Sequence, residues 1–153
     1  MLTIGQPAPD FSAPNQDGSE INLGDFKGKK VVLYFYPRDN TPGCTIEAND
    51  FKTNIEAFES LNTVVLGVSK DSIKSHTNFI CKYTLPFNLL SDEELEVIKA
   101  YDVWQLKKMY GKESMGLVRS TFLIDEEGIL RESWTKVKVK GHVEEVLEAI
   151  RAL

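Results

Sequence analysis

The chain has 153 residues, 42% of them hydrophobic and 27% charged, and a formal net charge of -5. This length suits one domain with a sizeable core, so we expect a single domain over residues 1–153. The mildly acidic balance argues against a nucleic-acid partner, because such a surface does not neutralise phosphates. Residues 1–10 lack the basic start and apolar run of a signal peptide, and no apolar stretch approaches the roughly 20 residues that span a bilayer. The sequence therefore predicts a cytoplasmic protein without a membrane partner.

The N-terminal half predicts a small hairpin followed by two strand–helix units. An Asp17-Gly18 turn between short apolar stretches is typical of a hairpin. Two unbroken β-branched runs indicate strands that are covered on both faces. A helix is expected after each, the second with Asp71 or Ser72 as its cap and an end before Pro86. The expected elements are strands over residues 11–13 and 21–23, a strand over 31–36, a helix over 41–60, a strand over 63–68 and a helix over 71–83.

The C-terminal half predicts a strand pair between helices. The stretch 104–116 has no clear period, so we expect an irregular insertion there. An acidic turn with Gly128 separates two β-rich runs, which is a hairpin signal. The remaining elements are a helix over residues 91–101, strands over 120–124 and 129–134, and a final helix whose apolar stripe is Val143, Val146, Leu147 and Ile150.

Alternating strands and helices favour parallel pairing, and the late hairpin makes the central sheet mixed. The sequence thus predicts an α/β, thioredoxin-like fold, with helices flanking the sheet, an N-terminal β-hairpin extension and an insertion. Lys136, Lys138 and Lys140 alternate with valines, a pattern typical of the solvated face of an edge strand.

Cys44 is the first candidate for chemistry. It follows Pro42-Gly43 at the expected start of a helix, directly after a buried strand. Unpaired N–H groups and the helix dipole favour an anion there, so the thiol should ionise more readily. An ordinary thiol has a pKa of about 8.5, and the thiolate dominates at neutral pH only if this value falls by about two to three units. Such a shift corresponds to stabilising the thiolate over the thiol by roughly 3–4 kcal/mol. The dipole contributes at most about 2 kcal/mol, so further donors are required.

Two residues could supply those donors. The hydroxyl of Thr41 stands three residues before the thiol and can donate a hydrogen bond. Arg119 stands at the start of the strand over 120–124, which in a thioredoxin-like sheet lies near the first helix. Arg38 is closer in sequence, but we interpret it as a solvated loop charge.

The sequence around Cys44 resembles a known family. The stretch Pro37-Arg38-Asp39-Asn40-Thr41-Pro42-Gly43-Cys44 fits the peroxiredoxin active-site pattern, in which a Thr precedes the peroxidatic Cys by three residues. Other stretches along nearly the whole chain are similar to the bacterioferritin comigratory protein, or peroxiredoxin Q, branch. They are Thr45-Ile46-Glu47-Ala48, Met109-Tyr110-Gly111-Lys112, the run from Arg119 to Asp125, and Lys136-Val137-Lys138-Val139.

The resemblance implies an antioxidant thiol peroxidase. Cys44 would attack a hydroperoxide, release water or alcohol and become a sulfenic acid. Thr41 would bind the peroxide and the sulfur, Arg119 would hold the thiolate and polarise the O–O bond, and Pro37 would shield the pocket. Glu47 also matches the branch pattern, either in a supporting role or only in a polar contact within its helix. By the same resemblance thioredoxin or a similar thiol would be the reductant, no cofactor is implied, and a monomer is expected.

One departure concerns the resolving cysteine. Many members of this branch carry a second Cys five residues after the first, where this chain has Asn49. The resemblance leaves Cys81, in the helix over 71–83, as the residue that resolves the sulfenic acid. On a helical wheel Cys81 lies beside the apolar stripe, which favours accessibility. Since a disulfide needs Cα atoms about 4.4–6.8 Å apart, we expect both helices to unwind locally before it forms.

Several alternatives stay open at this point. Cys81 could be an inert, partly buried thiol, and an external thiol would then resolve Cys44. Oxidation could instead serve a non-enzymatic redox sensor or interaction module. A metal site is disfavoured because Cys44, Cys81, His76 and His142 lack paired ligand spacing. We expect His76 at the surface or at its boundary with the core. A disulfide oxidoreductase is disfavoured because Cys44 lacks a Cys-x-x-Cys partner.

Overall fold

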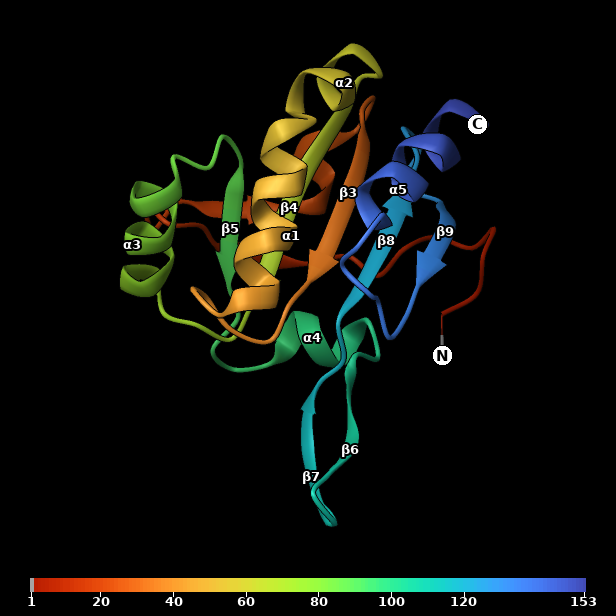
Figure 1. The fold of residues 1–153 in the computed structure, drawn as a ribbon. Coiled ribbons are helices and arrows are strands. Elements are labelled where there is room, and N and C mark those ends of the chain that lie inside the picture. Colours follow the sequence, from red (N-terminus) through yellow and green to blue (C-terminus); the bar gives the residue numbers. More distant parts are fainter. Residues whose placement is uncertain (1) are drawn as a thin grey trace.

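A mixed five-stranded sheet forms the centre of the computed structural model, which describes residues 2–153 (Figure 1). Its strand order is β5-β4-β3-β8-β9. The first three of these strands are parallel, while β8 is antiparallel to β3 and to β9. The mixed sheet expected from the sequence is therefore confirmed. The strands are β3 (Lys30–Phe35), β4 (Thr63–Ser69), β5 (Asn88–Ser91), β8 (Ser120–Ile124) and β9 (Leu130–Trp134).

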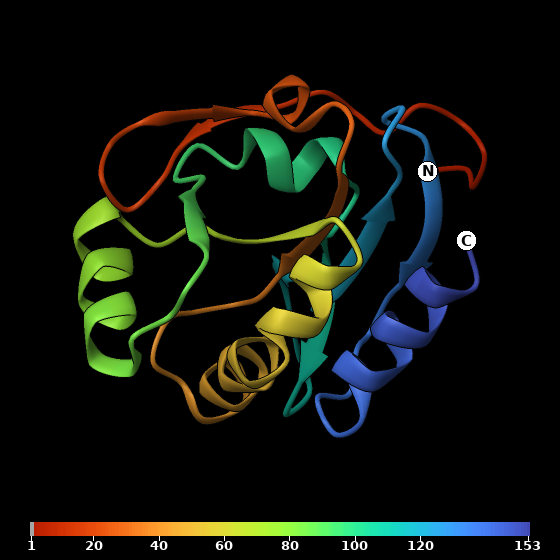
Figure 2. The same cartoon turned by 90° about the horizontal axis from the view of Figure 1, so that it is seen from above.

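Helices lie on both faces of this sheet (Figure 2). One face carries α1 (Pro42–Thr53), α2 (Ile55–Ser60) and α5 (His142–Arg151). The other carries α4 (Glu96–Ala100), the turn η1 (Leu23–Phe26) and the N-terminal hairpin of β1 (Ser12–Pro14) and β2 (Glu20–Asn22). The helix α3 (Ile73–Tyr83) lies at the β5 edge. Within residues 2–153, each helix is too short or too polar to cross a bilayer.

Two apolar cores follow from the alternation of side chains along the strands. In β3, Val31, Leu33 and Phe35 pack into the core under α4 and the N-terminal hairpin. Val32 and Tyr34 point the other way, into the core that contains Cys44. Because β3 is buried on both faces, its sequence is an unbroken apolar run. The strand thus carries both cores and ends beside the thiol.

The first departure from the sequence predictions lies between β4 and α4. Residues 88–91 form β5, and the helix expected from residue 91 begins only at Glu96. Ser91 does not cap a helix start, and Asp92 reaches the first turn of α4 only from a position before the N-cap, Leu95. Ser91 donates to the carbonyl of Asp71, and the Asp92 carboxylate accepts from the N–H of Ile98. A tertiary strand pairing has overridden a local helix signal.

The expected irregular insertion is also wrong. Strands β6 (Trp104–Met109) and β7 (Lys112–Leu117) form an antiparallel hairpin that projects from the body (Figure 1). Tyr110 and Gly111, with φ of 53° and 78°, make the two-residue turn whose twist suits a hairpin. Among the hairpin side chains that the structure describes, only the paired residues at its base, Trp104 and Leu117, contact a core, so the rest of the hairpin needs no regular apolar face.

Two smaller predictions also fail. The helix expected over residues 41–60 is interrupted at Asn54, which ends α1 and begins α2 while its amide donates to the carbonyl of Asp50. The lysine run from Lys136 to Lys140 lies in the connection between β9 and α5, and is not a strand. The other expected elements, the N-terminal hairpin and the C-terminal helix included, are present with bounds shifted by one or two residues.

Candidate active site

Cys44 is the third residue of α1, and the loop that leads to it leaves the end of β3. Thr41 is the N-cap, with extended φ and ψ of -90° and 156°, and Pro42 occupies the first helical position, where a missing N–H costs nothing. The thiol is free and only 1% exposed. The first N–H groups of the helix have no partner within it, so this end favours an anion over a neutral thiol.

Arg119 reaches Cys44 because of the sheet topology. In the antiparallel pairing of β3 with β8, Phe35 stands opposite Ser120, so the start of β8 lies beside the end of β3. The guanidinium Nη2 donates to Sγ of Cys44 at 3.2 Å. A Cβ on Gly43 would lie 3.3 Å from Nη2, so the glycine leaves the room that Arg119 needs against the helix. Arg119 is therefore a side-chain donor to the sulfur that acts in addition to the helix dipole.

Glu47 holds the other side of the guanidinium. Its Oε1 accepts from Nη1 of Arg119 at 2.6 Å, and its side chain is fully buried, one helical turn after Cys44. Burial raises the pKa of Glu47 to about 7, against the lowering effect of Arg119. Within residues 2–153, its Oε2 and the hydroxyl of Tyr34 are buried polar atoms without a hydrogen bond. Burial, followed by the charges of Glu47 and Cys44, also raises the pKa of Tyr34. Glu47 therefore contacts Arg119, and its hydrogen bond is not to a neighbour within its own helix.

Thr41 differs from expectation in one respect. Its hydroxyl donates to the backbone carbonyl of Arg38 at 2.9 Å, so its single proton is not directed at the sulfur. The lone pairs of this oxygen stay available to accept a hydrogen bond. Pro37 is half-buried just after β3, and Arg38 is exposed, as expected for a solvated charge.

Two charged or titratable neighbours of the site were missed by sequence reasoning. The stem of Lys107 in β6 packs over Gly116, where a Cβ would lie 3.0 Å from its Cδ. Burial and the charge of Arg119 lower the pKa of Lys107, whereas Cys44 raises it. The lysine therefore interacts electrostatically with both groups. His142, buried beside Thr121, has its pKa lowered to about 4 by burial and by Arg119. Neither residue carries a local signal, because each reaches the site through the packing of distant elements.

Cys81 is free and exposed, on α3. The structure therefore places the two thiols on different helices, α1 over the middle of the sheet and α3 at its β5 edge (Figure 1). Asn49, the residue at the short-range position, donates through its amide to the carbonyl of Thr45 within α1.

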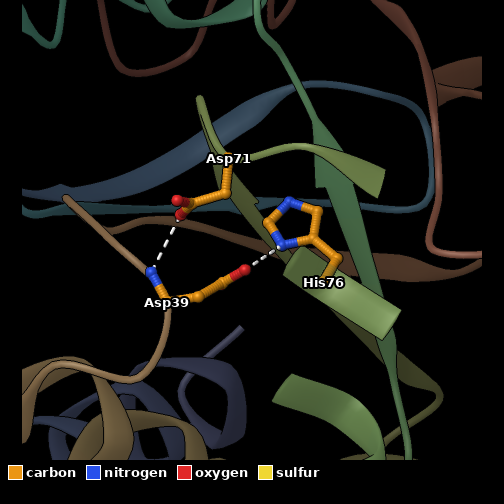
Figure 3. Close-up of side chains that lie close together, drawn as sticks. All are labelled: Asp39, Asp71 and His76. Carbon is orange, nitrogen blue, oxygen red and sulfur yellow. Dashed lines mark hydrogen bonds and ion pairs between the residues drawn. The ribbon is translucent and has the colours of Figure 1, made fainter. Parts of the chain in front are cut away.

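A buried polar cluster lies beside the loop that leads to Cys44 (Figure 3). Asp39, Asp71 and His76 bring one potential ligand atom each within 4.8 Å of one another. These atoms are already engaged, because Oδ2 of Asp39 accepts from Ser75 and pairs with His76, and Oδ2 of Asp71 accepts from Ser69 and the N–H of Asp39. We therefore interpret the cluster as a hydrogen-bond network. The expectation that His76 lies at the surface or at its boundary with the core is wrong, since it is fully buried.

The fold and this site together define a class of protein. A thiol at the start of the helix after a central strand, on a mixed sheet flanked by helices, is the arrangement of thioredoxin-like redox enzymes. Here an arginine donates to the sulfur, and a buried glutamate accepts from the other side of its guanidinium.

Comparisons with known proteins identify the family. The AhpC/TSA family model matches residues 4–133. Peroxiredoxin Bcp of Bacillus subtilis is 53% identical over 150 residues, covering 98% of this chain and 96% of the relative. A putative peroxiredoxin bcp of Coxiella burnetii is 51% identical over 146 residues, covering 95% and 97%. The chain therefore belongs to the AhpC/TSA family, in its Bcp or peroxiredoxin Q branch, and is a thiol peroxidase.

Solved structures agree with this assignment. A mutant of Xylella fastidiosa PrxQ matches with a TM-score of 0.94 at 40% identity, covering 99% of this chain and 97% of that one. Xanthomonas campestris bacterioferritin comigratory protein, studied for its alkyl peroxide reduction activity, matches with a TM-score of 0.89 at 42% identity, covering 93% and 90%. The thioredoxin-like fold expected from the sequence is confirmed.

Proposed function

We propose that Cys44 is the peroxidatic thiol, which reduces hydrogen peroxide and organic hydroperoxides to water and alcohols. The observation that carries this proposal is the 3.2 Å hydrogen bond from Arg119 to a thiol buried at a helix start. Activity toward organic hydroperoxides is supported by the alkyl peroxide reduction of the Xanthomonas relative.

The first step is a two-electron transfer from sulfur. The Cys44 thiolate attacks the terminal oxygen, an S–O bond forms, the O–O bond breaks, and the leaving oxygen departs as water or alcohol once protonated. Arg119 stabilises the negative charge that moves from sulfur to the leaving oxygen. Thr41, whose own proton is held by Arg38, offers lone pairs to the O–H of the hydroperoxide. Pro37 shields the pocket from the half-buried position after β3.

The second step is resolution by Cys81. Its thiol attacks the sulfur of the Cys44 sulfenic acid, the S–O bond breaks, water leaves and an intramolecular disulfide forms. Thioredoxin then returns two electrons and two protons. Because Cys44 is buried in α1 and Cys81 is exposed on α3, the helices must unwind locally before the sulfurs meet.

The end of α3 that carries Cys81 combines partly buried packing of Ile80 and Tyr83 with several polar contacts. Lys82 and Tyr83 each donate to Oδ1 of Asn40 at 3.2 Å, at exposed positions. Lys52 donates to the carbonyl of Tyr83 at 2.7 Å. Contacts of this kind contribute about 1 kcal/mol each, so unwinding this end costs little compared with unfolding a core.

One experiment tests both steps. Reduced protein is treated with one equivalent of hydrogen peroxide and its cysteines are mapped by mass spectrometry, with Cys81→Ser in parallel. The proposal expects a Cys44–Cys81 disulfide in the wild type and a sulfenic or sulfinic acid at Cys44 in the variant. A wild type that accumulates only oxidised Cys44 would instead support the alternative, a one-cysteine peroxidase resolved by an external thiol.

Turnover tests the remaining parts of the proposal. Repeated peroxide consumption with thioredoxin, its reductase and NADPH is expected of a thioredoxin-dependent enzyme. We propose that this enzyme is a cytoplasmic monomer of one domain, and size-exclusion chromatography with light scattering tests the monomer. A single stoichiometric oxidation in every thiol system would favour a redox sensor, the reading that family membership disfavours.

A further inference from the structure

His76 lies between two hydrogen-bond acceptors. Its ring is fully buried, with Nδ1 at 2.7 Å from Oδ2 of Asp39 and Nε2 at 2.9 Å from the backbone carbonyl of Leu90. A carbonyl has no proton to give, and a carboxylate has none either. A neutral imidazole donates from one nitrogen only. It could therefore donate to the carboxylate of Asp39 or to the carbonyl of Leu90, but not to both.

Both carboxylate oxygens of Asp39 accept hydrogen bonds from neighbouring side chains. Oδ1 accepts from the hydroxyl of Tyr36 at 2.6 Å, and Oδ2 accepts from the hydroxyl of Ser75 at 2.8 Å. With Nδ1 of His76, three side chains therefore meet one carboxylate: Tyr36 from the residue after β3, and Ser75 and His76 from α3. Hydrogen bonds donated to a carboxylate stabilise its charged form. The other carboxylate nearby, on Asp71, is itself engaged by Ser69 and by the N–H of Asp39.

We propose that His76 is a positioning residue, which carries a proton on each ring nitrogen and clamps the loop before Cys44 to α3 and β5. The proposal rests on the proposed role of Cys44. The clamped residue, Asp39, lies between Pro37 and Thr41, and its backbone N–H is held by Asp71 at 2.8 Å. Both its side chain and its backbone are thus fixed, and with them the loop that delivers Thr41 and the first turn of α1.

The clamp also divides α3. Its first half is tied down by the buried bonds of Ser75 and His76, and the buried side chain of Phe79 extends this anchored part into the core that contains Cys44. The last turn packs only partly buried side chains against that core and adds the exposed contacts of Lys82 and Tyr83. A groove of about 390 Å³ runs along α3 beside the loop and is lined in part by Asn40, Ser75 and Lys82. The unwinding that frees Cys81 therefore stops before Phe79 and His76, and the peroxide-binding loop keeps its shape while the end of the helix moves.

Two matched variants test the clamp. In His76→Asn the amide nitrogen takes the place of Nδ1 and keeps a donor toward Asp39, while in His76→Gln it takes the place of Nε2 and keeps only the bond to Leu90. The readout is the second-order rate of Cys44 oxidation by hydrogen peroxide, measured by stopped-flow on the reduced protein below each variant's thermal midpoint. We expect His76→Gln to be at least about tenfold slower, and His76→Asn to stay within about threefold of the wild type. Equal losses in both variants, or none in either, would overturn the positioning role.

The protonation of the ring is tested on the wild type, so that a variant that fails to fold leaves the proposal testable. In reduced, ¹⁵N-labelled protein near pH 7, both ring nitrogens of His76 should show a bonded proton. An Nδ1 without a proton would overturn the charged clamp. Neither measurement depends on Cys81. Peroxidase activity that persists in Cys44→Ser would refute the proposed function instead, and would leave the nitrogen signals of His76 unchanged.

Discussion

The two cysteines of this chain lie in contrasting surroundings. Cys44 is buried at a helix start, with Arg119 on its sulfur and Glu47 behind the arginine. Cys81 is exposed near the end of α3, beside a turn held by polar contacts. This difference fits the proposed division of roles, in which Cys44 needs a charge already placed beside it to attack a peroxide and Cys81 needs freedom to move.

The largest expected effect separates the two thiols directly. Cys44→Ser should lower the rate of peroxide reduction by at least about a thousandfold, since the nucleophile is gone. Cys81→Ser should keep the rate of the first oxidation within about twofold and lose turnover with thioredoxin. Single-turnover oxidation and coupled NADPH consumption, measured side by side, check both. A first step that slows equally in the two variants would break the contrast.

Removing the positive charge of Arg119, which contacts the sulfur of Cys44, should have the next largest effect. Arg119→Gln is expected to slow Cys44 oxidation by about a hundredfold or more, because a preorganised donor to the developing charge is lost. Arg119→Lys keeps the charge but cannot span Sγ of Cys44 and Oε1 of Glu47 at once, so it should recover only part of the rate. Full recovery in the lysine variant would show that charge alone matters and that the fork geometry does not.

Glu47 predicts a pH dependence of stability. Its pKa is raised from 4.5 to about 7 in the folded protein, so the folded state binds more protons than the unfolded state in this window. The free energy of unfolding should therefore fall as the pH rises from about 4.5 to 7, by on the order of 3 kcal/mol from this group.

Urea unfolding at pH 4.5 and pH 8 measures this slope. Glu47→Gln should remove most of it, while the matched control Glu56→Gln, at an exposed position on α2, should keep it. A slope that Glu47→Gln leaves unchanged would assign the pH dependence to other groups.

The smallest expected effect concerns the last turn of α3. Tyr83→Phe removes one hydrogen bond to Asn40, and Lys52→Met removes the bond to the carbonyl of Tyr83. Each should speed formation of the Cys44–Cys81 disulfide about two- to fivefold, because a bond of about 0.5–1 kcal/mol no longer holds the helix closed. Quenched-flow alkylation after oxidation follows the rate, with Thr53→Ala on the exposed side of α1 as a control. A slower reaction would show that these contacts guide the encounter of the two thiols.

Much of this protein could be predicted from its sequence, where the information is local. The apolar run of β3 marks a central strand, and Pro42-Gly43-Cys44 marks a helix start that carries a thiol. The pattern around Cys44 also indicated the family, since the spacing of Thr41 and Cys44 lies within a single turn of chain. Hydrophobic period and capping chemistry act over a few residues, so they can be recognised without a structure.

Only the tertiary structure decided the rest. The strand β5 and the β6–β7 hairpin depend on pairing, which local patterns did not show. Arg119 reaches Cys44, 75 positions earlier in the chain, through the register of β3 and β8. His76 looked like a surface or boundary residue in sequence, yet it is buried because Asp39 and Leu90 converge on it from two other elements. Long-range charge pairing has no periodic signature in a single chain, so the resemblance could name Arg119, but only the folded structure shows its contacts with Cys44 and Glu47.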